Sequence, residues 1–177
     1  LYERGDDIVV FTQPDKPVGR KAIMTAPPVK KLALEYGLDV FQFDKIRSEE
    51  GLAALKDADP ELMVTAAFGQ ILSKENLSVP RYGCINVHGS LLPKYRGAAP
   101  IQCAVINGEE KTGVTTMLTD IGLDTGDILL ERETELGKDE TAGELFDRLA
   151  EMGAALLKEK KAKLERNELE PHKQTDD

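Results

Sequence analysis

The stretch that most restricts the fold is Leu62–Ala67, six consecutive residues without a charged side chain. A continuous apolar strand of this length is typical of a sheet that is covered on both faces. Other strand-like and helix-like segments alternate through the first half of the chain. We expect strands at 7–11, 38–41 and 84–88, and helices at 28–36, 48–58 and from about residue 74. This alternation predicts a mainly parallel sheet with crossover helices.

The second half predicts a different pairing. Strands are expected at 112–118 and 128–136, and the acidic, glycine-containing turn 120–127 between them is too short for a parallel crossover. These two strands should therefore pair antiparallel. A long helix should follow over 141–165, because Thr141 and Glu144 form a capping box at its start. The predicted fold class is α/β, a Rossmann-like open sheet that is mainly parallel, with an antiparallel C-terminal strand pair and flanking helices.

Composition excludes several classes of protein. Hydrophobic residues make up 41% and charged residues 31% of the 177 residues, which is typical of one globular domain. There is no signal peptide and no apolar run of membrane-spanning length, so we expect a cytoplasmic protein without a membrane partner. Two cysteines give neither a disulfide framework nor a metal cluster, and we expect free thiols and no metal. The net charge of -9 argues against a nucleic-acid partner.

The segment Cys84–Gly97 carries the candidate chemistry. Asn86 and His88 are two apart on a predicted strand, so they should project from the same face near its end. Ligands of open α/β sheets bind at this end of the strands. An amide beside an imidazole could bind a flat ligand and perform acid–base chemistry on it. The same two residues could equally be hydrogen-bonded within a core, and their spacing alone does not decide between these interpretations.

A basic segment stands out in this acidic chain. Residues 12–27 are expected to form a long, proline-stiffened loop that carries Lys16, Arg20 and Lys21. The loop could be an ordinary solvated surface, or it could contact a phosphate-bearing partner. Phosphate contacts are local, so a cluster of cations can bind nucleic acid despite the overall negative charge.

Three motifs together resemble a known family. Asn86-x-His88 leads into Ser90-Leu91-Leu92-Pro93 and the stretch Arg96–Ile101, and Asp120-x-Gly122-x-Asp124-Thr125-Gly126-Asp127 follows. This pattern resembles the formyl-transferring enzymes that use 10-formyltetrahydrofolate as co-substrate. The resemblance implies that Asn86, His88 and Asp124 are catalytic. It also implies a folate pocket lined by two segments, namely Phe68, Gly69, Gln70, Ile71, Leu72, Ser90, Leu91, Leu92 and Pro93.

Within that family, Thr12–Arg20 and Pro28-Val29-Lys30 are similar to the methionyl-tRNA formyltransferase branch. The resemblance implies formylation of initiator methionyl-tRNA for translation initiation, with Lys16, Arg20 and Lys21 contacting the tRNA. It further implies a catalytic domain over 1–166 that lacks the family's first strand, and a linker over 167–177 toward a C-terminal domain. We expect a monomer.

Other functions remain open at this point. A sister enzyme could formylate glycinamide ribonucleotide or a nucleotide-linked amino sugar. A non-catalytic folate- or RNA-binding module would keep the pocket but would not need Asn86, His88 and Asp124. A dinucleotide-dependent oxidoreductase domain suits the sheet, but the sequence has no GxGxxG or P-loop glycine pattern.

Overall fold

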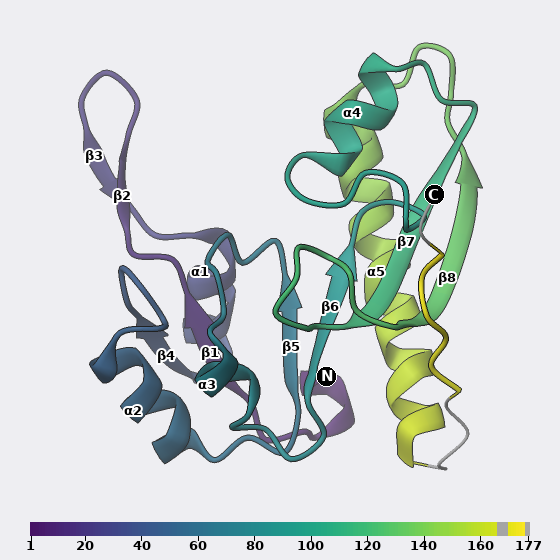
Figure 1. Ribbon diagram of the computed structural model, residues 1–177. Helices are drawn as coiled ribbons and strands as arrows, with labels where there is room; N and C mark the ends of the chain where they lie inside the picture. Colours follow the sequence, from purple (N-terminus) through teal and green to yellow (C-terminus); the bar gives the residue numbers. More distant parts are fainter. Residues whose placement is uncertain (166–169, 176–177) are drawn as a thin grey trace. The chain divides into compact units, whose positions relative to one another are not determined.

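The computed structural model describes residues 1–165 and 170–175, and it divides into two compact units. The first unit consists of residues 1–60 and 68–79. The second consists of residues 61–67 and the chain from residue 80 onward (Figure 1).

The first unit is a small α/β assembly built on a parallel strand pair. Its 3-10 turn and helices are η1 (Tyr2–Arg4), α1 (Pro28–Glu35), α2 (Glu49–Ala58) and α3 (Lys74–Leu77). Strands β1 (Val9–Thr12) and β4 (Asp39–Gln42) pair in parallel, as the alternating pattern predicts. Helix α2 begins where expected because the Ser48 hydroxyl accepts a hydrogen bond from the Gly51 amide.

The prediction of a loop over residues 12–27 is wrong. The structure has a hairpin there, in which β2 (Lys16–Val18) pairs antiparallel with β3 (Ile23–Thr25) (Figure 1). Strands of three residues are too short to show an alternating pattern, and Pro17 argues against a strand. Nearly every side chain of the two strands is exposed, so backbone pairing rather than burial defines them.

The second unit contains a four-stranded sheet in the order β5-β6-β7-β8. Its strands are β5 (Met63–Ala66), β6 (Cys84–His88), β7 (Lys111–Leu118) and β8 (Ile128–Glu135). β5 and β6 are parallel, and β7 and β8 pair antiparallel, as predicted. The antiparallel region extends one strand further, because β6 and β7 also run in opposite directions.

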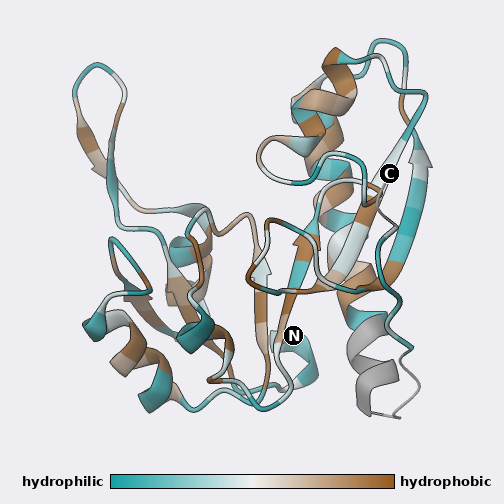
Figure 2. Ribbon diagram, viewed as in Figure 1, coloured by the Kyte–Doolittle hydropathy of each residue, from teal (hydrophilic) through white to brown (hydrophobic). Residues whose placement is uncertain are grey.

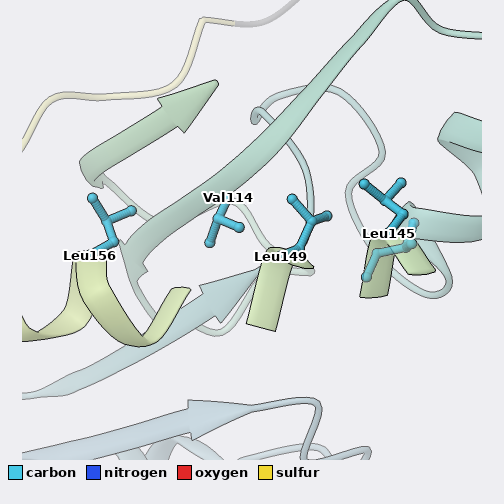
Figure 3. Packing of buried hydrophobic residues seen from close by; sticks show 5 residues of the cluster. Val114, Leu145, Leu149 and Leu156 are labelled. Atoms are coloured by element: carbon cyan, nitrogen blue, oxygen red, sulfur yellow. The ribbon is translucent and has the colours of Figure 1, made fainter. Parts of the chain in front are cut away.

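Helix α5 (Ala142–Glu165) packs on this sheet together with α4 (Pro100–Ile106). Leu145, Leu149 and Leu156 of α5 gather around Val114 of β7 and form the core (Figure 3). The helix comes so close that a Cβ on Gly153 would lie 2.8 Å from a methyl group of Val87. Hydropathy follows this burial, because β8 becomes hydrophilic where its side chains leave the core (Figure 2).

The start of α5 is fixed by polar contacts. Thr141 and Glu144 form the predicted capping box, each side chain accepting a hydrogen bond from the other residue's amide. One turn later, Arg148 donates two hydrogen bonds to the Glu140 carboxylate, at 3.0 and 2.7 Å. These bonds, together with one from the Gly137 amide, hold the pKa of Glu140 below its ordinary value of 4.5.

This lowered pKa predicts a pH-dependent stability. The Glu140 contribution should be complete above about pH 4.5 and should be lost as the pH falls through the lower folded-state pKa. We expect Glu140→Gln to lower the midpoint of thermal unfolding by about 2–4 °C at neutral pH, the scale of about 1 kcal/mol in a chain of this size. The difference in unfolding midpoint between Glu140→Gln and the parent protein should disappear in strongly acidic buffer. Glu151→Gln, at an exposed position on α5, is the control, and an equal effect there would contradict this account.

The predicted linker over 167–177 lies partly outside the described residues, which omit 166–169 and 176–177. In its described part, His172 and Ile128 exchange two backbone hydrogen bonds, at 2.8 and 3.0 Å. This segment therefore packs against the beginning of β8.

No helix in the described ranges is long and apolar enough to span a membrane. Cys84 and Cys103 both lie in the part of the chain that the structure describes, and neither forms a disulfide. Burial raises the pKa of the Cys84 thiol.

Candidate active site

The three side chains expected to be catalytic converge within the second unit. Asn86 and His88 lie two apart near the end of β6, and Asp124 comes from the turn that joins β7 to β8. One carboxylate oxygen of Asp124 accepts a hydrogen bond from Asn86 Nδ2 at 3.3 Å. The other carboxylate oxygen lies 3.5 Å from His88 Nδ1. The strand period therefore placed both β6 side chains beside one carboxylate.

The orientation of the Asn86 amide is fixed by its partners. Its nitrogen must face Asp124, because an ionised carboxylate can only accept, and its oxygen then accepts a hydrogen bond from the Thr65 hydroxyl at 2.9 Å. Thr65 lies directly opposite Asn86 in the β5–β6 ladder. An amide nitrogen carries two hydrogens, and only one is needed for Asp124. The second is available to a bound ligand.

His88 is buried, with 6% of its side chain exposed, and both of its ring nitrogens face oxygen atoms. Nε2 lies 2.9 Å from the Tyr95 carbonyl oxygen, which can only accept, so Nε2 carries a hydrogen. Nδ1 faces the Asp124 carboxylate, which is also an acceptor when ionised. A doubly protonated ring is the form that donates to both. The two ring nitrogens of His88 thus lie between two hydrogen-bond acceptors.

Several local contacts hold Asp124 in place. Its carboxylate also accepts a hydrogen bond from the Gly97 amide at 2.8 Å. Its backbone lies in the left-handed region, at φ 52°, which non-glycine residues adopt at a cost of roughly 1 kcal/mol. Asp120 stabilises the turn by accepting hydrogen bonds from the Gly122 amide and the Thr125 hydroxyl. The turn is therefore built so that Asp124 points at Asn86 and His88.

The Ser90–Pro93 segment follows β6 in the same unit. The Ser90 hydroxyl is buried and donates to the Lys94 carbonyl, and Leu92 packs in a small core with Met117 and Ile128. Leu91 and Pro93 are half-buried. The side chains of Ser90 and Leu92 therefore shape this loop from inside, and Leu91 and Pro93 are the apolar groups that reach its surface.

The other expected folate segment, Phe68–Leu72, belongs to the first unit. Gln70 ties it to the chain after β4, accepting from the Ile46 amide and donating to the Phe43 carbonyl. Ile71 is 71% exposed. A cavity of about 210 Å³ lies here, lined by Asp44, Lys45, Arg47, Gly69, Gln70 and Ile71.

A larger cavity of about 540 Å³ lies in the second unit beside Ser90, Leu91 and Lys94. Asn86, His88 and Asp124 are not among its lining residues. The three are nevertheless not sealed in the interior. Asn86 is half-buried and the Asp124 side chain is 16% exposed, so both reach the surface beside the buried His88 ring.

The three cations expected to bind tRNA lie on the hairpin. Lys16 is in β2, and Arg20 and Lys21 are in the turn before β3. All three are exposed, and the structure shows no ion pair from any of them to another residue in the described ranges. The nearby Lys30 is different, because its ammonium group bonds both carboxylate oxygens of Asp15, at 2.8 and 2.9 Å. Its charge is therefore neutralised locally, and this pairing lowers the pKa of Asp15.

Sequence reasoning missed the residues that support the three central side chains. Thr65 lay within the apolar run, and its position in register with Asn86 was not foreseeable without knowing which strands are neighbours. Tyr95 and Gly97 act through backbone groups, which leave no signal in side-chain patterns. Among the described residues, no group of three histidine, cysteine, aspartate or glutamate side chains is arranged to hold a metal ion.

The fold and the three converging side chains define an α/β protein with a polar acid–base site at the end of an interior strand. A sequence profile described as Formyl transferase matches residues 2–160. The chain belongs to the formyl transferase family.

Known relatives support this assignment. The methionyl-tRNA formyltransferase of Ruminiclostridium cellulolyticum is 58% identical over 152 residues, which cover 86% of this chain and 49% of that protein. The methionyl-tRNA formyltransferase of Citrifermentans bemidjiense is 52% identical over 177 residues, covering 99% of this chain and 56% of that protein. The chain thus spans about half the length of the curated relatives it matches.

Solved structures of low identity share the fold. The phosphoribosylglycinamide formyltransferase of Anaplasma phagocytophilum superposes with a TM-score of 0.76 at 17% identity, covering 97% of both chains. The formyltransferase PseJ of Anoxybacillus kamchatkensis, solved with a UDP-linked formamido sugar and tetrahydrofolate, gives 0.66 at 21% identity and covers 95% of this chain and 82% of that one.

Proposed function

We propose that this chain carries the catalytic centre that transfers the formyl group of 10-formyltetrahydrofolate to the amino group of methionyl-initiator-tRNA. The observation that carries the proposal is the convergence of Asn86, His88 and Asp124 in a chain more than half identical to proteins named for this activity. The rival acceptors are glycinamide ribonucleotide and nucleotide-linked amino sugars, and the experiment below separates them.

Formyl transfer places defined demands on the site. The acceptor amine attacks the formyl carbon, and a tetrahedral intermediate with an oxyanion forms. Its bond to the folate nitrogen then breaks, the acceptor nitrogen loses a proton and the folate nitrogen gains one. The enzyme must supply a donor to the oxyanion and an acid–base group near the two nitrogens.

Asn86 meets the first demand. One of its amide hydrogens is engaged by Asp124, and its oxygen accepts a hydrogen bond from Thr65, so both ends of the amide are held. The second hydrogen can point at the developing oxyanion without reorganisation. A donor held in this way lowers the barrier because it is already oriented before the charge appears.

His88 meets the second demand, with Asp124 behind it. The carboxylate beside Nδ1 holds the ring orientation. We assign the proton transfers to Nε2, whose hydrogen faces the Tyr95 carbonyl in the free protein, so a substrate atom must replace that carbonyl as its acceptor. His88 can then donate the proton that the leaving folate nitrogen needs and, once neutral, take one from the amine.

We assign the folate to Ser90–Pro93 in the second unit, while a role for Phe68–Leu72 in the first unit stays a prediction of the resemblance. The half-buried Leu91 and Pro93 can provide apolar contacts for the pteridine. Backbone groups of Ser90–Pro93 can recognise its polar edge. Ser90 and Leu92 contribute by shaping the loop, since their side chains face inward.

We assign the tRNA contact to the hairpin. Residues 16–25 contain Lys16, Arg20 and Lys21 and no acidic residue, in a chain whose net charge is -9. Local cations can still neutralise phosphates, and each neutralised phosphate steepens the salt dependence of binding. The exposed, unpaired position of these three residues suits that role.

Arg20→Ala should weaken use of the tRNA without changing use of the folate. We expect the KM for methionyl-tRNA to rise several-fold and the salt dependence of tRNA binding to lose about one unit of slope. Steady-state kinetics at three salt concentrations would measure both effects. Lys138→Ala, an exposed cation in the second unit, is the matched control. A loss of folate affinity equal to the loss of tRNA affinity would argue against a tRNA-contacting hairpin.

The acceptor itself can be tested directly. The protein is incubated with formyl-labelled 10-formyltetrahydrofolate and, in parallel, with methionyl-initiator-tRNA, glycinamide ribonucleotide or a nucleotide-linked amino sugar. We expect label to appear on methionyl-tRNA at a kcat/KM about 10⁴-fold or more above either other amine, the scale of a site that recognises polar groups. Preference for another amine would show that the chain acts as a sister formyltransferase and would contradict the proposed acceptor.

A further inference from the structure

One contact of the C-terminal segment reaches the site. Gln174 is half-buried, and its side chain makes three hydrogen bonds within the second unit. Its nitrogen donates to the Asp124 carbonyl and to the Gly126 carbonyl, both at 2.8 Å. Its oxygen accepts from Arg96 Nε at 2.9 Å. All donor capacity of this amide is therefore used on the turn that carries Asp124.

The contact of Gln174 lies on the backbone of the turn that positions Asp124. Asp124 has a left-handed backbone, and the residues around it must hold that conformation. Gln174 bonds the carbonyl of Asp124 itself and the carbonyl two residues later, so it bridges two backbone groups of this turn. The backbone bridge between His172 and Ile128 keeps the segment in place next to the turn.

The third bond joins a second part of the site. Arg96 precedes Gly97, whose amide donates to the Asp124 carboxylate at 2.8 Å. Gln174 therefore links the loop after β6 and the turn after β7, the two backbone segments that locate the Asp124 carboxylate.

We propose that Gln174 is a positioning residue, whose side-chain amide holds the Asp124 turn and the Arg96 loop in the geometry that formyl transfer requires. This inference rests on the proposed function for its kinetic consequence, but its structural consequence can be measured independently. Gln174 does not touch the reacting atoms. Its effect passes through the backbone of Asp124.

The chemistry of the side-chain amide predicts how variants of Gln174 should behave. Gln174→Glu keeps the size and the attraction to Arg96, but it places a carboxylate oxygen against two carbonyl oxygens. Gln174→Ala removes all three bonds. We therefore expect both variants to lower kcat by about 10- to 100-fold, the scale of a small misplacement of a catalytic group, with little change in the KM for the folate. Lys173→Ala, its exposed neighbour, should behave as the parent protein.

Two measurements separate positioning from general stabilisation. In an Asp124→Ala background, Gln174→Ala should lower the rate no further, because the group that it positions is gone. Hydrogen exchange of the amides in residues 120–127 should be faster in Gln174→Ala than in Lys173→Ala. A multiplicative loss of rate in the Asp124→Ala background would overturn the positioning role.

The two proposals fail in different ways. Unchanged exchange in residues 120–127 of Gln174→Ala would overturn the inference about Gln174 whatever the activity. Faster exchange with an undiminished rate would overturn its link to catalysis. Failure of the parent protein to formylate any of the three amines would overturn the proposed function, while the exchange result would still decide whether Gln174 holds the turn.

Discussion

With alanine in place of His88, we expect the rate of formyl transfer to fall by about 10²–10⁴-fold, the range typical of removing a general acid or base. The ring is the group that can move a proton between the two nitrogens, and the Asp124 carboxylate holds its orientation. Without the His88 ring, water must carry the proton, and this transfer is slower. Single-turnover formylation of methionyl-tRNA is the measurement, since it reports the chemical step.

Removing a buried ring also leaves the Tyr95 carbonyl without its donor, at a cost of roughly 1–3 kcal/mol of stability. The rate must therefore be measured well below the unfolding midpoint of the variant. His88→Gln is the second variant, because its amide can donate but cannot shuttle a proton. His172→Ala is the matched control, since that side chain is exposed and its pairing uses the backbone alone. Parent-like rates in both His88 variants would remove His88 from the mechanism.

Gly126→Ala should damage both the fold and the rate. A Cβ on Gly126 would lie 1.7 Å from the Leu118 carbonyl oxygen, a backbone atom that cannot rotate away. The turn must shift, and Asp124 is only two residues distant. We expect a loss of stability of at least about 1–3 kcal/mol and a fall in rate of about 10²-fold. Chemical denaturation and single-turnover kinetics would measure the two effects.

The control is a glycine with room for a methyl group. A Cβ on Gly143 in α5 would have its nearest neighbour at 3.9 Å, an ordinary contact. Gly143→Ala should therefore be neutral or stabilising by up to about 1 kcal/mol, because alanine favours a helix. If Gly126→Ala were as harmless as Gly143→Ala, the close approach of the turn to Leu118 would be wrong.

Local sequence signals predicted the elements whose cause is local. Ser48 and Thr141 begin helices because their hydroxyl groups accept backbone hydrogen bonds a few residues away, and the sequence contains both partners. The hairpin at 16–25 escaped prediction because its strands bury almost nothing. The antiparallel direction of β7 against β6 depends on strand order, which local patterns do not contain.

In the candidate site, too, the features with a local cause could be predicted and those that depend on the tertiary structure could not. Asn86 and His88 share a face because of the strand period, which can be read from the sequence. The resemblance supplied Asp124, whose distance from them along the chain gives no sign of contact. Gln174 lay in a polar tail that looked like a linker, and only the three-dimensional structure places its amide on the Asp124 turn.

We expect Asn86, His88 and Asp124 to act as one unit in formyl transfer, and a double-mutant cycle on Asn86 and His88 tests this expectation. Single-turnover rates of Asn86→Ala, His88→Ala and the double variant are compared with the parent protein. We expect each single variant to lose about 10²-fold or more, and the double variant to lose far less than the product of the two, as residues of one catalytic unit do. Parent-like rates in the single variants, or fully multiplicative losses in the double variant, would contradict the account.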